Sequence, residues 1–224
     1  MYKYETHLHT SPISKCASGT VRECLEFYKK LNYDGVFITN HFLDGNINVD
    51  RQLSYEEKIN FYFSDYEDGF EIGKELGIKV FPGVEISYKG TDFLIYGLSK
   101  EWYLAHPEIM EMKKSVELNY LAENGALVIH AHPYRESSYI DHIRLFPRLV
   151  HGVEVNASRT KEENEIAKLY AKHYNLLLFA GSDNHMRGTD RALGGMESER
   201  PIESVDDFIK AVKNREAKPF LTEM

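Results

Sequence analysis

The sequence is poor in cysteine, lacks long apolar runs and has no excess of positive charge. Its two cysteines, Cys16 and Cys24, exclude a disulfide framework. No stretch approaches the roughly 18–20 apolar residues of a membrane helix, and residues 1–5 lack the apolar core of a signal peptide. The net charge of −8 disfavours binding to nucleic acid or acidic membranes. We therefore expect a cytoplasmic protein that binds neither membranes nor nucleic acid in bulk.

Apolar runs alternate with amphipathic stretches along the whole chain. The 224 residues are 42% hydrophobic and 28% charged, which suits a single globular domain over residues 1–224. Runs typical of buried strands occur at 35–41, 78–85, 92–98, 126–132, 152–156 and 176–181. The spacing of apolar residues predicts helices at 21–31, 55–76, 108–123, 161–174 and 205–214, with a final short strand at 217–221.

This order favours parallel strands connected by helices. Residues of the kind that bind metals follow the ends of several runs, namely His7, His9, His41, Glu85, His130, His132, Asp183 and His185. In a closed β/α barrel the carboxyl ends of the strands share one rim, where active sites lie. Such a barrel gathers all these side chains into one cavity. An open doubly wound sheet is the alternative, and it brings fewer of them together.

The most informative stretch is His7-Leu8-His9, which follows the strand-forming residues 2–6. Residues two apart in a strand point to the same face, so both imidazoles leave the backbone on one side. Two neutral imidazoles side by side are a natural start for a transition-metal site. A pair of edge-strand histidines that binds nothing is the alternative for this stretch alone.

Five motifs, in order, resemble those of the PHP (polymerase and histidinol phosphatase) family. They are His7-Leu8-His9, Thr39-Asn40-His41, Gly83-Val84-Glu85, His132-Pro133 and Gly181-Ser182-Asp183-Asn184-His185. The resemblance runs from about Tyr4 to Pro219. It implies a distorted seven-stranded β/α (TIM-like) barrel. It also implies two or three divalent metal ions and the hydrolysis of phosphate esters by a metal-activated hydroxide.

Carried over residue by residue, the resemblance assigns a role to each ligand. It implies that the first metal is held by His7, His9, Glu85 and Asp183. It further implies that Glu85 bridges to a second metal bound by His132, and that His41 and His185 belong to a third. Independently, imidazoles with a few carboxylates suit Zn, Mn or Fe better than Mg or Ca. Glu85 and Asp183 are the residues expected to be central to catalysis.

The chain departs from the family pattern at three places. Asn40 stands where the family usually has aspartate, and Leu94 aligns with a histidine that often binds the second metal. Residues 14–16, which include Cys16, occupy the region of a third-metal ligand. Cys16 is therefore either a thiolate ligand or an ordinary loop cysteine. His130, which precedes His132 by two residues, is either a further ligand or a neutral core histidine.

Three residues near the strand ends are candidates for binding substrate. Arg135, three residues after His132, could grip two phosphate oxygens, with a surface salt bridge as the alternative. Arg191 is a weaker candidate, and Asn156 either faces the cavity or makes a local turn bond. The expected function is hydrolysis of a small phosphomonoester, either histidinol-phosphate-like or a nucleotide phosphate. A non-catalytic metal-binding or ligand-sensing barrel is the rival.

Overall fold

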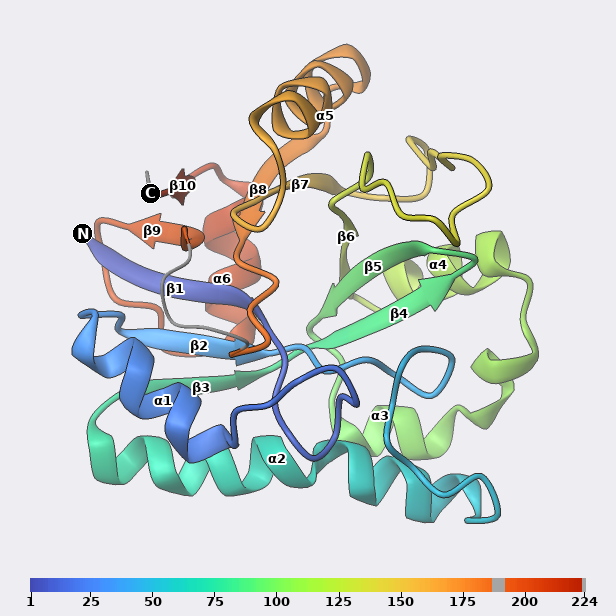
Figure 1. The fold of residues 1–224 in the computed structure, drawn as a ribbon, viewed down its shortest axis with the longest axis vertical. Helices are drawn as coiled ribbons and strands as arrows, with labels where there is room; N and C mark the ends of the chain where they lie inside the picture. The colour runs from blue at the N-terminus through green and yellow to red at the C-terminus, as the bar shows by residue number, and fades with distance from the viewer. Residues whose placement is uncertain (187–191, 223–224) are drawn as a thin grey trace.

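Two five-stranded sheets carry the fold in the computed structural model, which describes residues 1–186 and 192–222 (Figure 1). The first sheet has the order β10-β9-β1-β2-β3 and contains Tyr2–Leu8 (β1), Gly35–Ile38 (β2), Lys79–Pro82 (β3), Gly194–Ser198 (β9) and Ala217–Leu221 (β10). The second has the order β4-β5-β6-β7-β8 and contains Val84–Tyr88 (β4), Thr91–Tyr96 (β5), Leu127–Ala131 (β6), Gly152–Asn156 (β7) and Leu177–Gly181 (β8).

Both sheets are mixed, and the predicted seven-stranded TIM-like barrel is wrong. β1 is parallel to β2 but antiparallel to β9, and β5 is antiparallel to both β4 and β6. Within the described residues, isolated bridges at Leu8–Asn184 and His41–Glu85 link the sheet regions, and no continuous ladder closes a barrel. A tight turn at 89–90, where both residues have positive φ, joins β4 to β5. Such a turn reverses the chain where a barrel would need a helical crossover.

The predicted strand over 78–85 is broken at Gly83, which separates β3 in the first sheet from β4 in the second. The Gly83 N–H donates to the carbonyl of Ile38 at 2.9 Å. A Cβ on Gly83 would lie 2.6 Å from Cγ2 of Thr39, so the close approach requires glycine. The break transfers the chain from one sheet to the other two residues before Glu85.

The helices largely follow the predicted ranges. They are Val21–Lys30 (α1), Tyr55–Leu76 (α2), Lys100–Ala105 (α3), Lys114–Glu123 (α4), Lys161–Tyr174 (α5) and Val205–Lys213 (α6), with a 3-10 helix at Pro107–Glu111 (η1). The predicted single helix over 108–123 is divided between η1 and α4 because Met112 and Lys113 adopt extended backbone conformations. Of the helices in the described part of the chain, none is long and apolar enough to cross a membrane.

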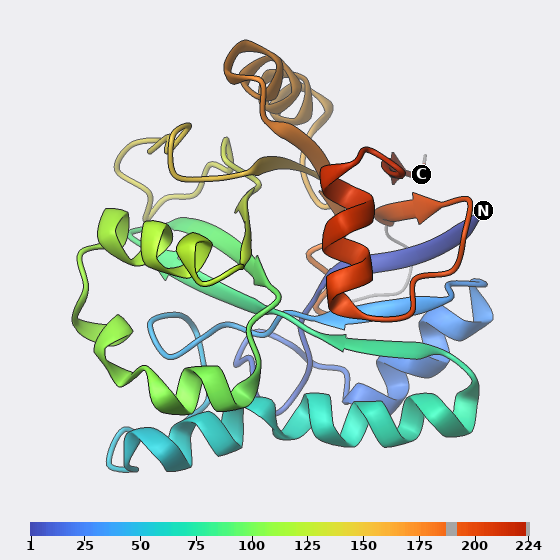
Figure 2. The ribbon, with the colours of Figure 1, turned by 180° about the vertical axis from the view of Figure 1, so that it is seen from behind.

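An aromatic core joins the two sheets and supports the strand ends. Phe37 of the first sheet packs edge-on against Tyr96 of the second, with ring centroids 5.2 Å apart. Phe208 of α6 lies 4.4 Å from the Phe37 ring, and α6 covers this core in the rear view (Figure 2). On the opposite side, α1 and α2 lie against β2 and β3 (Figure 1). The site residues therefore extend from strands that are packed on both faces.

Candidate metal centre

β1 leads into two fully buried histidines whose ring nitrogens lie close together. The Nε2 atoms of His7 and His9 are 3.2 Å apart. Leu8 lies in an apolar cluster with α1, as the two-residue period of a strand predicts. Nδ1 of His7 is 3.0 Å from Glu154, and Nδ1 of His9 is 3.1 Å from the hydroxyl of Ser14. These bonds fix both rings, so the Nε2 atoms face a common point.

Two carboxylates from the second sheet and its adjoining loop meet this pair. Glu85, on β4, places its oxygens 3.2 Å from Nε2 of His7 and 3.5 Å from Nε2 of His9. Asp183 follows β8, and its Oδ1 is 3.5 Å and 3.3 Å from the same two atoms. Its φ of 51° lies in the left-handed region, which aspartate tolerates better than most residues. The structure thus brings together the four residues predicted for the first metal.

Three further histidines surround these residues. Nε2 of His132 lies 3.7 Å from Glu85, and Nδ1 of His41 lies 2.5 Å from the other oxygen of that carboxylate. The His185 ring stacks on His9 with a centroid separation of 4.2 Å. All the predicted ligands therefore lie around one point, where the ends of the two sheets meet.

The donor set fits divalent transition metals. Three overlapping groups each place their ligand atoms within 4.8 Å of one another: His7 with His9 and Asp183, His7 with Glu85 and His132, and His9 with His41 and His185. Donor separations of 3.2–3.5 Å match a shared ion with bonds of roughly 2.0–2.2 Å. In the described part of the chain, the buried Oε2 of Glu85 and Nδ1 of His41 contact each other as an ion pair but form no hydrogen bond of regular geometry.

Glu85 and His9 have the protonation states that metal binding needs, whereas burial lowers the pKa of His7 and of His41 but the neighbouring carboxylates outweigh it and raise both. Burial raises the pKa of Glu85, but His41, His7 and His9 outweigh it and hold that pKa well below its usual range. Burial lowers the pKa of His9, and the neighbouring His185 and His41 lower it further. A charged carboxylate beside a neutral imidazole is the form in which both bind metals.

Two buried glutamates missed by the sequence analysis orient the ligands. Glu154 of β7 contacts Nδ1 of His7 through one oxygen and accepts the His132 N–H at 3.1 Å through the other. Glu5 of β1 accepts the backbone N–H groups of His7 and Ser182 at 2.8 Å and 3.0 Å. Their signal in the sequence is a carboxylate inside an apolar strand, which has to find partners when buried.

Glu154→Gln is expected to weaken metal binding by about 10- to 100-fold, the usual cost of losing a partner that orients a ligand. Glutamine can accept one of the two hydrogen bonds but not both, so His7 or the His132 backbone loses its partner. Titration against a chromophoric chelator measures the affinity, with exposed Glu162→Gln as the matched control. Equal affinities in both variants would exclude a positioning role for Glu154.

The structure accounts for two of the departures from the family pattern. The Oδ1 atom of Asn40 accepts hydrogen bonds from the Thr10 N–H and the Ser14 hydroxyl, each at 2.8 Å, and so ties two loops together. Leu94 pairs with Glu85 across β4 and β5 and is fully buried in the aromatic core. Asp92, two residues earlier on β5, instead lines the pocket that surrounds the metal centre.

Cys16 lines the same pocket, next to His41 and His185. Burial raises the pKa of its thiol, but hydrogen bonds with His185 and His41 more than compensate and bring it to about 6. A thiolate near two imidazoles is chemically able to bind metal.

Arg135 lines the pocket around the metal centre, which has a volume of about 470 Å³. Its Nη2 lies 2.7 Å from Oδ2 of Asp92, and its guanidinium stands over the Tyr139 ring. The ion pair is largely buried, so Arg135 is not in the surface salt bridge weighed from the sequence. Asp92 holds the Arg135 guanidinium in the wall of the pocket.

His130 faces away from the metal centre, among aromatic rings. It stacks on Phe93 with centroids 5.1 Å apart, and Tyr170 lies 6.1 Å away. Of the two alternatives for His130, its surroundings favour the neutral core histidine. His132 follows the end of β6 and has a φ of 25°, so the two-residue period of the strand does not extend to it. Burial lowers the pKa of His130 to about 3, so this ring is neutral.

The structure describes one of the two remaining substrate-binding candidates, Asn156. Asn156 makes a local turn, because its Oδ1 accepts hydrogen bonds from the N–H and hydroxyl of Ser158 at 2.9 Å and 2.6 Å. Arg191 lies outside the described residues.

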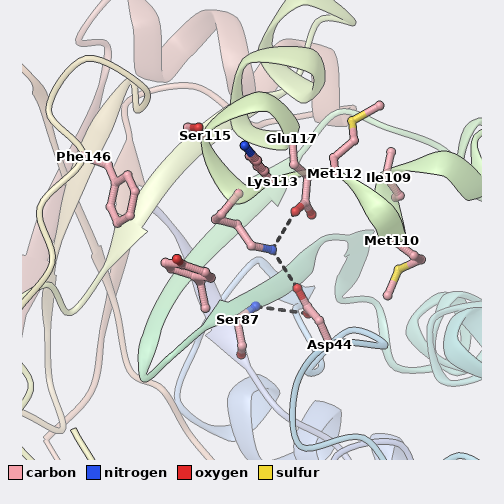
Figure 3. Close-up of a pocket in the computed structure, with 11 residues that line it drawn as sticks. Asp44, Ser87, Ile109, Met110, Met112, Lys113, Ser115, Glu117 and Phe146 are labelled. Atoms are coloured by element: carbon pink, nitrogen blue, oxygen red, sulfur yellow. Dashed lines mark hydrogen bonds and ion pairs between the residues drawn. The ribbon is translucent and has the colours of Figure 1, made fainter. Parts of the chain in front are cut away.

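A second cavity, of about 600 Å³, adjoins the metal pocket and shares Asp44 and Ser87 with it (Figure 3). Lys114 of α4 lines it and lies 2.8 Å from Asp44 and 2.7 Å from Glu117. This ion-paired group joins α4 to the loop that follows His41.

Comparisons with known proteins agree with this architecture. A family model described as PHP-associated matches residues 161–217. No curated protein matches the chain. A two-domain Bacteroides vulgatus protein containing a predicted PHP-like metal-dependent phosphoesterase matches 98% of this chain, at 16% identity and a TM-score of 0.67. The chain spans 64% of that protein.

Two other solved structures match almost end to end. A candidate metal-dependent phosphoesterase from Bifidobacterium adolescentis shows 14% identity and a TM-score of 0.59, with 96% of each chain covered. An amidohydrolase from Chromobacterium violaceum, with bound sulfate and no metal, shows 14% identity and a TM-score of 0.54, covering 95% of this chain and 96% of its own. Together with the family model, these likenesses confirm the resemblance to the PHP family.

Proposed function

Because the chain resembles the PHP proteins in its motifs and its fold, we propose that it is a metal-dependent hydrolase of a small phosphomonoester. The observation that carries this proposal is the convergence of five histidines and two carboxylates from both sheets on one point. Zn, Mn or Fe, two or three ions per chain, suits this mixture of nitrogen and oxygen donors. The substrate is a histidinol-phosphate-like compound or a nucleotide phosphate.

The residues divide into those that bind metal and those that bind substrate. When bound, divalent ions at such a site polarise the phosphoryl group and lower the pKa of a nearby water. His7, His9, Glu85 and Asp183 would hold these ions, with every ring fixed by its second nitrogen or by packing. The Arg135 guanidinium presents donors to a phosphate oxygen at the pocket edge. No side-chain nucleophile is required.

Arg135→Ala is expected to raise KM for a phosphomonoester about tenfold or more, because one charged hydrogen bond to phosphate is lost. We expect kcat to fall as well if the contact tightens in the transition state. Arg135→Lys retains the charge without the planar fork and should give an intermediate KM. Steady-state kinetics, with thermal unfolding as a check on folding, measure the effect. Unchanged KM in Arg135→Ala would limit the residue to its ion pair with Asp92.

A substrate screen tests the proposed function against its rivals. Since one structural neighbour is named as an amidohydrolase, amide hydrolysis is the second candidate. Purified protein is assayed with an aryl phosphate, a bis-aryl phosphodiester and an aryl amide that share one chromophore. We expect the monoester to be cleaved fastest. Preferential amide cleavage would favour the second candidate, and no turnover with any of the three would favour a non-catalytic metal-binding protein.

The small pocket and the net charge of −8 also support a small substrate over a long polyanion such as nucleic acid.

A further inference from the structure

A third cavity, of about 570 Å³, lies directly beside the metal pocket. Asp44, Gly45 and Asn46, in the loop after β2, line both hollows. The loop after β1 lies alongside this segment, and the Lys15 N–H donates to the Asn46 carbonyl at 3.0 Å (Figure 1). The metal pocket and this cavity are therefore neighbours that share one short stretch of chain in their walls.

Three cations line the cavity, which we call the cationic cavity: Lys15, Arg51 and Lys58. In the described part of the chain, none of them forms an ion pair with a carboxylate. The Lys58 ammonium donates to the Arg51 carbonyl at 2.9 Å, which holds these two residues together. Positive side chains that line one cavity favour the binding of an anion there.

The carboxylate of this cavity is already neutralised. Asp44 pairs with Lys114 at 2.8 Å, on the side that faces the neighbouring cavity of Figure 3. That neighbouring cavity is balanced, because Lys113 and Lys114 oppose Asp44 and Glu117. Three cations and one carboxylate line the cationic cavity, which gives it an excess of positive charge in a chain whose net charge is −8. A local positive potential of this kind selects anions.

We propose that the cationic cavity binds a second anionic group of the substrate, a phosphate or a carboxylate, while the metal centre holds the phosphate that is cleaved. This inference rests on the proposed function and narrows its substrate class to phosphate esters with a further anion. Arg51 offers a planar fork and the two lysines offer flexible ammonium groups, a combination suited to an oxyanion of either type.

The test compares esters that differ only at their far end. Straight-chain diols phosphorylated at both ends are matched with the same diols phosphorylated at one end, and with hydroxy acids phosphorylated on the hydroxyl. We expect kcat/KM for the doubly anionic esters, corrected for equivalent phosphates, to exceed that of the singly phosphorylated diol by about tenfold or more at the best chain length. The two anionic series distinguish phosphate from carboxylate as the second group.

Variants connect this preference to the cavity. Arg51→Gln and Lys58→Gln should each reduce the ratio of kcat/KM values by about threefold to tenfold, and added salt should reduce it in the unaltered protein. Exposed Lys172→Gln, on α5, is the matched control and should leave the ratio unchanged.

A ratio near one at every chain length, or an unchanged ratio in Arg51→Gln and Lys58→Gln, overturns the inference while hydrolysis stands. No hydrolysis of any ester overturns the proposed function, and this inference with it.

Discussion

Asp183→Asn is expected to lower kcat/KM for a phosphomonoester at least about a hundredfold. The substitution removes the charge of a carboxylate that would bind metal together with the neighbouring histidines. The Oδ1 atom of Asp183 lies 3.3 Å from Nε2 of His9 and 3.5 Å from Nε2 of His7, close enough to bind the same metal ion as both histidines. Burial raises the pKa of Asp183, but the surrounding histidines, His7 foremost, lower it well below its usual range. The unaltered residue is therefore an anion that asparagine cannot replace.

The same substitution should leave the fold intact. Asparagine tolerates the left-handed backbone at this position, where φ is 51°, and it preserves the side-chain shape. Phosphate release measures activity, and circular dichroism with thermal unfolding measures folding. Asp68→Asn, an exposed change on α2, is the matched control. Retention of most activity in Asp183→Asn would remove this residue from the ligand set.

Glu5→Ala is expected to destabilise the protein by several kcal/mol, because each buried donor that loses its acceptor costs about 1–3 kcal/mol. The Glu5 carboxylate is fully buried and accepts the N–H groups of Thr6, His7 and Ser182, together with the Tyr28 hydroxyl at 2.7 Å. The Ser182 hydroxyl also donates to it in a short contact. Alanine leaves all these donors buried without an acceptor.

Glu5→Gln is the matched control for this loss. It retains one carbonyl oxygen for the backbone donors, so we expect a smaller loss of about 1–2 kcal/mol. Equilibrium urea unfolding measures both variants. Since a typical domain is stable by about 5–15 kcal/mol, Glu5→Ala should show a large fall in midpoint or fail to fold. Equal stability of the alanine variant and the unaltered protein would show that the hydrogen bonds to Glu5 do not stabilise the fold.

The candidate ligands were predictable because each lies at or just beyond the end of an apolar run. The two-residue period placed His7 and His9 on one face, and charged residues after strands indicated a shared rim. The two-residue period did not apply to His130 and His132, because His132 lies beyond the end of the strand and has a positive φ. Nothing in the neighbouring sequence indicates that φ. Glu154 and Glu5 were missed because a carboxylate within a strand reads equally well as a solvent-facing residue.

The barrel could not be excluded from the sequence, because closure depends on pairing between distant segments. The strand β9 had no apolar run long enough to predict it, yet it pairs antiparallel to both β1 and β10. The single run over 78–85 contains two strands that belong to different sheets, and only Gly83 marks the change. The ligands converge nonetheless, since the isolated bridges at Leu8–Asn184 and His41–Glu85 bring the sheet ends together beside them.

The most direct measurement is phosphate release from phenyl phosphate by protein stripped with a chelator, before and after divalent metal is restored. Metal content per chain is determined on the same samples. We expect the stripped protein to release almost no phosphate, and stoichiometric Zn, Mn or Fe to restore turnover as the centre of His7, His9, Glu85 and Asp183 fills. Full activity in metal-free protein would contradict a metal-dependent phosphoesterase.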